Sequence, residues 1–227
     1  MFLALIGLVA AKDRALDPGD VDVRAGWGTT PRVRGTAGWA MWGLSWWGTE
    51  GSLDVGLLRV GPVAISGGVE GGYSRPWVTQ GFVNGVLDAY VVTNRIDLGA
   101  EAWSLGGRAR LTFAARDEAV LQPYLVLGVG RRQLTLSSAW AGSVLIADAS
   151  YTLTSWHVSP GAGFGLVLGR GLLLSWEARW NQGTSARADT TGTVRLGPYE
   201  LANAQGSSVS REAPRGLTWA FSAGWRF

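Results

Sequence analysis

The sequence predicts an all-β fold: a closed, antiparallel, eight-stranded transmembrane β-barrel with short turns at one end and long loops at the other. Three observations support this fold class. Apolar and polar residues alternate in eight segments, short and long connections follow one another along the chain, and the last residue is aromatic. Alternation with a period of two puts the two sets of side chains on opposite faces of a strand. A sheet in lipid must close into a barrel, because no water satisfies an open edge.

The last strand shows the alternation most clearly. Every second residue from Leu217 to Phe227 is apolar. The residues between them are small or polar: Thr218, Ala220, Ser222, Gly224 and Arg226. We therefore expect an apolar face toward lipid and a polar face toward the barrel interior.

Seven earlier segments repeat this pattern. In chain order they are 21–28, 53–57, 63–74, 102–113, 121–133, 154–168 and 172–181. Short connections are expected at 61–62, 115–120 and 169–170, and long loops at 29–51, 75–100, 135–153 and 183–215. Short periplasmic turns and longer external loops are typical of outer-membrane barrels. Residues 33–48 fit either an aromatic loop or a further strand, and the loop is the preferred interpretation.

The composition suits one barrel. The 227 residues include 34 glycines and 13 tryptophans but no cysteine, and Lys12 is the only lysine. A soluble barrel also alternates, but its large apolar residues face inward. In this chain the charged residues lie on the face opposite to the large apolar residues. If that face were inside, its charges would have to be paired, because a small dry core accepts only paired charges. The net charge of +3 is scattered, so nucleic acid is not an expected partner.

The N-terminus predicts the domain organisation. Residues 1–11 are apolar, too short to span a membrane as a helix, and end on small residues, as a secretory signal does. A hydrophobic strand is the alternative. We expect a signal peptide at 1–11, which could be truncated because a positive leader is missing, a periplasmic lead at 12–19 and the barrel at 20–227.

Charged residues on the inward faces form a predicted lumen charge network. Its members are Asp22, Arg24, Asp54, Glu70, Arg108, Arg110, Arg132, His157, Glu177, Arg179 and Arg226. Arginine exceeds acid in this set. The preferred interpretation is a paired network that plugs the lumen, since eight strands leave an interior that side chains fill. An anion-favouring pore constriction is the alternative.

One group of residues could carry chemistry. His157 is the only histidine, Ser159 lies two positions later on the same face, and Glu177 faces inward on the next strand. This pattern resembles the lipid A deacylases, in which a serine attacks an ester and histidine is the base. Those enzymes carry their active site on the lipid-facing exterior, whereas alternation points His157 inward. A packed lumen histidine is therefore the preferred interpretation, and a single histidine excludes a histidine metal cluster.

The chain resembles the small bacterial outer-membrane β-barrels of the OmpA-like transmembrane-domain or OmpX type. The resemblance rests on the alternation, on the terminal Phe221, Trp225 and Phe227, and on residues 122–130. It implies that these three aromatics form the signal read by the barrel-assembly machinery, and that the protein lies in the outer membrane of a Gram-negative bacterium. The many tryptophans and the loop lengths depart from the simplest members.

The expected function is non-enzymatic. We expect a structural or surface-interaction role in contact with outer-membrane lipid, with no cofactor and with an unidentified extracellular ligand at the long loops. A narrow channel for small solutes and a lipid A deacylase-like enzyme are the alternatives.

Overall fold

The computed structural model describes residues 16–30, 46–76, 95–114, 121–142, 145–168, 171–210 and 215–227. Within these ranges the chain forms nine antiparallel strands in one sheet. They are β1 (Val21–Thr30), β2 (Trp46–Val60), β3 (Val63–Pro76), β4 (Arg95–Phe113), β5 (Leu121–Ala141), β6 (Leu145–Leu168), β7 (Leu172–Leu196), β8 (Tyr199–Ser210) and β9 (Arg215–Arg226).

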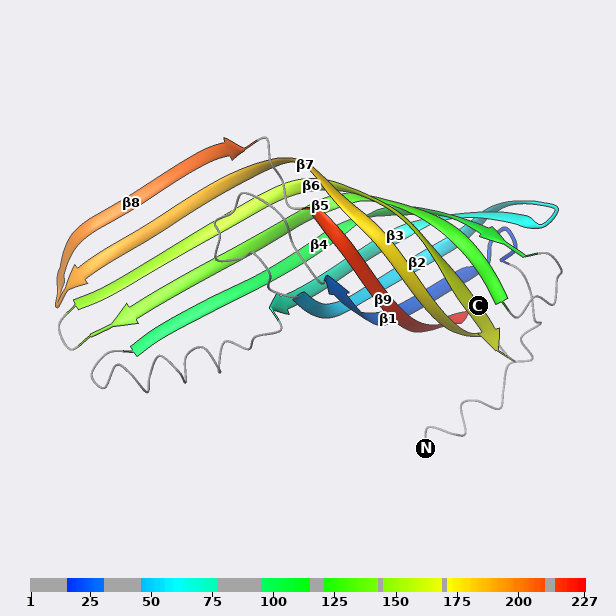
Figure 1. Ribbon diagram of the computed structural model, residues 1–227, viewed down its shortest axis with the longest axis horizontal. Coiled ribbons are helices and arrows are strands. Elements are labelled where there is room, and N and C mark those ends of the chain that lie inside the picture. The colour runs from blue at the N-terminus through cyan, green and yellow to red at the C-terminus, as the bar shows by residue number, and fades with distance from the viewer. Residues whose placement is uncertain are drawn as a thin grey trace, which may run out of the picture.

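Eight of these strands close into a barrel, as the sequence predicts. Strands β1 to β7 pair in chain order, and β9 pairs with both β7 and β1. The backbone N–H of Phe227 donates to the carbonyl of Val21 at 2.9 Å, so β1 and the end of the chain meet at the seam. The Gly61–Pro62 turn and Phe227 lie at one end of the barrel, called here the turn end (Figure 1).

Longer strands and a ninth strand correct the prediction of long loops. Residues 135–153 belong to β5 and β6, apart from the short connection between them, and residues 183–210 form the end of β7, a turn and β8. The strands continue past the barrel as an outer sheet, made of 95–102, 134–141, 145–154, 185–196 and 199–210. Figure 1 shows this sheet extending from the barrel on the side opposite to the turn end.

Some predictions fall outside the described residues. The predicted signal peptide, the first part of the lead, and the turns at 115–120 and 169–170 lie there. Of the undecided segment 33–48, only the last three residues are described, and they belong to β2.

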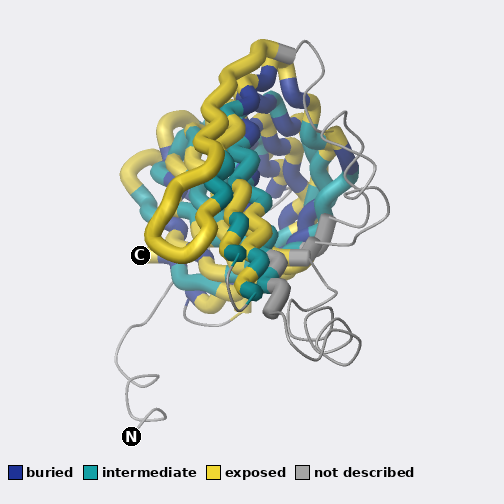
Figure 2. Tube along the Cα trace, turned by 90° about the vertical axis from the view of Figure 1, so that its left-hand side faces the viewer, coloured by how far each residue is buried: buried dark blue, intermediate teal, exposed yellow. Residues whose placement is uncertain are grey.

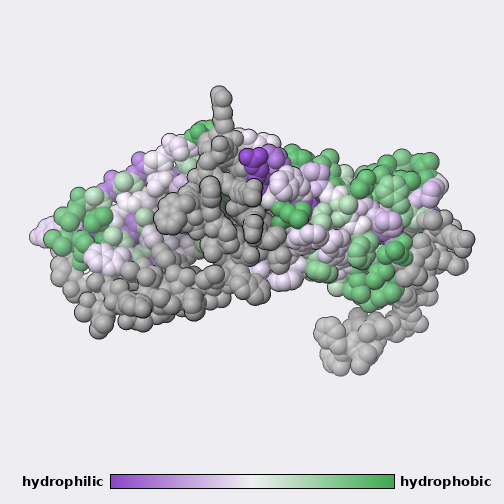
Figure 3. Space-filling model, viewed as in Figure 1, coloured by the Kyte–Doolittle hydropathy of each residue, from purple (hydrophilic) through white to green (hydrophobic). Residues whose placement is uncertain are grey.

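The outer face of the barrel is apolar. Each strand of the ring exposes at least one large apolar side chain, such as Val23, Leu53, Val69, Leu105, Leu127, Phe164, Leu174 and Phe221. Apolar side chains gather over the barrel half in Figure 3. Aromatics follow the border toward the outer sheet, where Tyr73 pairs directly with Trp103. An apolar belt with aromatics at its border is the surface that a lipid bilayer requires. Among the described residues no helix is long and apolar enough to cross a membrane.

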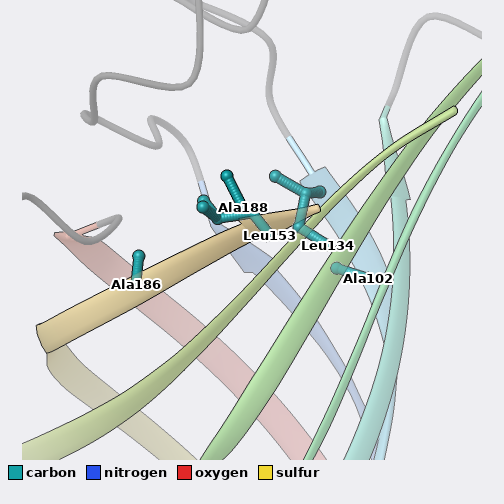
Figure 4. Packing of buried hydrophobic residues seen from close by; sticks show 5 residues of the cluster. All are labelled: Ala102, Leu134, Leu153, Ala186 and Ala188. Atoms are coloured by element: carbon teal, nitrogen blue, oxygen red, sulfur yellow. The ribbon is translucent and has the colours of Figure 1, made fainter. Parts of the chain in front are cut away.

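Buried residues line the inner face of the sheet (Figure 2). The kind of side chain on this face changes along the strands. In the barrel it carries the charged residues. In the outer sheet it carries an apolar cluster of Ala102, Leu134, Leu153, Ala186 and Ala188 (Figure 4). Tyr151 packs against this cluster, and burial raises the pKa of its hydroxyl. The concave side of the outer sheet is therefore a second, apolar core above the charged lumen.

The residues before β1 pack against the turn end. Leu16 is only 1% exposed, and Gly56 exchanges two backbone hydrogen bonds of 2.9 Å with Gly19 and Asp20. Arg59 donates to Asp17 at 2.7 Å. The part of the predicted lead that is described, residues 16–19, thus packs against the end of the barrel.

Candidate functional site

A carboxylate near the turn end gathers three arginines. Asp22 is 0% exposed and accepts hydrogen bonds from Arg24 at 2.8 Å, Arg110 at 2.7 Å and Arg226 at 2.7 Å. Arg24 lies on β1 with Asp22 and Arg226 lies opposite it on β9, whereas Arg110 reaches it from β4 across the interior. We call this group the Asp22 cluster. A buried carboxylate is tolerated here because three cations contact it.

The Arg108 cluster lies next to it, further from the turn end. The Arg108 guanidinium lies 3.2 Å from Asp54, 3.5 Å from Glu70 and 3.1 Å from Glu177. Arg179 pairs with both glutamates. Arg110 reaches Asp54 at 3.6 Å and so connects this cluster to the Asp22 cluster.

The two clusters contain most of the predicted lumen charge network. Nine of its members are joined by ion pairs: Asp22, Arg24, Asp54, Glu70, Arg108, Arg110, Glu177, Arg179 and Arg226. Within the part of the chain that the structure describes, Arg132 and His157 are the two members outside these pairs. The structure therefore brings the predicted charges together in a connected network, with one arginine and the histidine left apart.

Tyr124 was missed as a site residue by the sequence reasoning. The guanidinium carbons of Arg24 and Arg110 lie 5.8 Å and 5.3 Å from the centre of its ring. A cation over an aromatic face gains electrostatic attraction that grows when water is absent. The alternation in β5 places Tyr124 on the inward face, and this position could have identified it as a site residue, because a large inward aromatic has to pack against the lumen charges.

A cavity of about 110 Å³ lies in the barrel on the far side of the Arg108 cluster from the turn end. Arg108, Glu177 and Arg179 contribute to its wall. Arg132, His157 and Ser159 also line it. The interior is therefore filled with paired charges toward the turn end and hollow toward the outer sheet.

The residues of the candidate hydrolase do not form a catalytic triad in this structure. His157 and Ser159 both face the cavity, as alternation predicts, but His157 Nδ1 and Ser159 Oγ have no hydrogen-bond partner among the described residues. The Glu177 carboxylate is occupied by Arg108 and Arg179. Across the same residues no group of histidine and acidic side chains could hold a metal ion.

The three aromatics of the predicted assembly signal lie in or directly after β9. Phe221 and Phe227 are exposed on the outer surface. Trp225 pairs with Val23 of β1 and with Leu172 of β7. These residues therefore lie along the strand that closes the ring, and their role in assembly stays a prediction.

The outer sheet has an open edge at β8. This strand pairs with β7 over Tyr199–Ser210, and no described strand pairs with its other side. Its side chains from Tyr199 to Val209 are all exposed, and Glu200 is the only charged residue among them. An edge without lysine or proline and with a single charge near its start leaves a row of backbone donors and acceptors available to another strand.

No protein-family model matches the chain, and no curated protein is significantly similar to it. Its structure is similar to that of a major outer membrane protein from Thermus thermophilus, at 10% identity and a TM-score of 0.56, covering 91% of this chain and 99% of that chain. Ail, the attachment invasion locus protein of Yersinia pestis, shares 13% identity with a TM-score of 0.46, covering 92% and 99%. Neisserial surface protein A shares 14% identity with a TM-score of 0.45, covering 91% and 94%.

The likeness to the Thermus protein confirms the predicted fold. The chain has the fold of a bacterial outer-membrane β-barrel protein. Its own apolar belt shows where such a barrel lies, because large apolar side chains surround the ring and the charges point inward. Closed β-barrels with this arrangement are integral proteins of the outer membrane.

Proposed function

We propose that this protein has a surface-interaction role in the outer membrane, with a closed lumen and with the outer sheet as the part that contacts a partner. The observation that carries the proposal is the open edge of β8. The barrel then serves as the anchor that holds this edge outside the membrane.

The ion clusters support a closed lumen. Asp22 and Asp54 are both 0% exposed, and the guanidinium groups of Arg110 and Arg108 reach them from β4 across the interior. Opening a path would separate buried charges from their partners, which costs several kcal/mol for each charge. A continuous channel is therefore the less favoured of the two non-enzymatic functions.

An extended segment of another protein is the partner that the edge suits best. Adding a strand to an open edge satisfies its backbone groups, and the exposed side chains beside it select the sequence. A second copy in the same membrane suits it poorly. Barrel strands are inclined by about 35–45° to the membrane normal. Two copies in one membrane would be related by a twofold rotation about that normal, which inclines their edge strands in opposite directions. The two edges would then cross instead of lying side by side.

Strand addition can be tested by panning a phage library of random linear peptides against the folded protein. Wild-type protein is expected to enrich peptides of alternating pattern, and the Ala202→Lys/Ala204→Lys double variant is expected to lose them, since edge lysines oppose pairing. The matched control is Ser137→Lys/Ala139→Lys, which adds the same charge to β5, a strand paired on both sides. Equal enrichment by the edge variant, or none by wild type, would contradict the proposal.

The enzymatic alternative has a direct test of its own. Ser159 lines the lumen cavity, so a membrane lipid would have to enter the barrel to reach it. We expect purified protein to release no fatty acid from lipid A. Release that disappears in a Ser159→Ala variant would instead establish an acyl hydrolase.

A further inference from the structure

The lumen cavity contains one arginine whose charge is not met by a carboxylate. Arg132 lines the cavity from β5, level with Ser104 of β4 and Ser155 of β6. Within the described ranges, all five other arginines of the lumen network have an ion pair, and Arg132 has none. A cation held in a small lumen without a partner is costly, and an anion would remove that cost.

Two further side chains in the cavity have unused hydrogen-bonding atoms. His157 is 8% exposed and Ser159 is 1% exposed, and within the described structure neither Nδ1 of the histidine nor Oγ of the serine has a partner. Neutral imidazole can donate from one ring nitrogen, and a hydroxyl can always donate. Both groups can therefore serve an anion without a change in their charge.

Two closely packed glycines on β5 lie beside these two side chains. Gly130 pairs with His157 and Gly128 pairs with Ser159. A Cβ atom added to Gly130 would lie 2.6 Å from the carbonyl oxygen of Leu105 and 3.1 Å from Cε1 of His157. One added to Gly128 would lie 2.6 Å from Oε1 of Glu70 and 3.3 Å from Oγ of Ser159. Larger residues at these positions would clash with the lumen wall and displace His157 or Ser159.

The charge balance of the wall decides the class of anion. Four arginines line the cavity, Arg24, Arg108, Arg132 and Arg179, against three acids, Glu50, Glu70 and Glu177. The wall thus carries an excess of one positive charge, which a monoanion neutralises and a dianion exceeds. The planar guanidinium fork matches the two oxygens of a carboxylate.

We propose that this cavity binds a small monocarboxylate, with Arg132 as the main contact and His157 and Ser159 as hydrogen-bond donors. The volume of about 110 Å³ suits a solute of a few heavy atoms. The proposal goes beyond the surface role and does not depend on it, because the site lies inside the barrel and the β8 edge lies outside.

The single histidine makes the test specific, because its ring signals in an NMR spectrum need no further assignment. Folded protein in detergent micelles is titrated with sodium acetate and, separately, with sodium sulfate. Acetate is expected to shift the His157 signals with saturation. Arg132→Gln is expected to weaken this binding about tenfold or more, since hydrogen bonds between charged groups are lost.

The matched control is Arg131→Gln. Arg131 is the neighbouring residue on β5 and is exposed on the outer face, so this variant removes the same charge without touching the cavity. It is expected to bind acetate as wild type does. Three results would overturn the proposal: no saturable shift in wild type, unchanged binding in folded Arg132→Gln, or sulfate binding as tightly as acetate. Heat-modifiable migration in gels shows beforehand that each variant is folded.

Discussion

Arg110 donates a hydrogen bond of 2.7 Å to Asp22, although their strands, β4 and β1, are not neighbours in the barrel. The bond therefore crosses the interior. Asp22 also accepts from Arg24 and Arg226, so one carboxylate holds side chains from three strands. This part of the lumen is closed by charge pairing rather than by an apolar core.

Removing the charge of Asp22 is expected to destabilise the barrel strongly. Asp22→Asn leaves three arginines close together without their shared partner, and breaking a buried pair in this way costs about 3–5 kcal/mol. Urea unfolding of the refolded protein, followed by tryptophan fluorescence, measures the loss.

The control for this prediction is an exposed ion pair. Arg187 and Asp189 lie 3.1 Å apart in the outer sheet, with side chains that are 65% and 42% exposed. Asp189→Asn is expected to change stability by less than about 1 kcal/mol, because water screens such pairs. Similar losses in the two variants would show that the Asp22 cluster is not a buried, closed network.

A charge placed in the apolar belt is expected to be costly. Leu127 lies on the outer face of β5 within the barrel, and Leu127→Arg should cost about 2–4 kcal/mol if the position lies near the middle of the bilayer. Ser137→Arg lies on the same strand but in the outer sheet, and should have little effect. Folding yield in lipid vesicles compares the two, and equal yields would contradict the assigned membrane boundary.

Enlarging Gly56 is expected to displace residues 16–20 from the turn end. A Cβ atom at this position would lie 2.1 Å from the carbonyl oxygen of Asp17, a distance that forces one of them to move. Gly56→Ala should therefore increase protease cleavage before β1. Gly51→Ala on the same strand, where the nearest atom is 3.6 Å away, should leave cleavage as in wild type.

Phe227 is expected to matter for assembly in cells more than for folding in vitro. Its backbone pairs with Val21, which any residue can do, while its side chain is exposed. Phe227→Ser should lower the amount of protein in the outer membrane but refold normally from urea into micelles. Phe164→Ser, another exposed aromatic, is the control, and equal loss in cells would count against a terminal signal.

The barrel strands could be predicted because lipid imposes a pattern on them. In β5 every outward residue from Leu121 to Val129 is exposed and every inward residue from Gln122 to Gly130 is buried. Apart from Val126, each of these inward positions is glutamine, tyrosine or glycine, so the sequence alone separates the faces. The same requirement placed Asp22 and Arg110 inward.

The outer sheet could not be predicted because strands outside the bilayer do not need apolar residues on their outward face. Residues Ser137 to Ala139 and Ala147 to Ala149 form strands with exposed faces, and their small and polar side chains carry no alternation. Pairing partners also escaped prediction. Nothing in the spacing of the charges shows that Arg108 meets three acids while Arg132, among the described residues, meets none, since this depends on the register between strands.

Ion conductance across a planar lipid bilayer tests the closed, charge-paired lumen most directly. Wild-type protein inserted in the bilayer is expected to give no sustained current at moderate voltage, because the Asp22 and Arg108 clusters fill the interior. Stable, ohmic current steps from the wild-type protein would contradict the closed lumen and would favour the channel function instead.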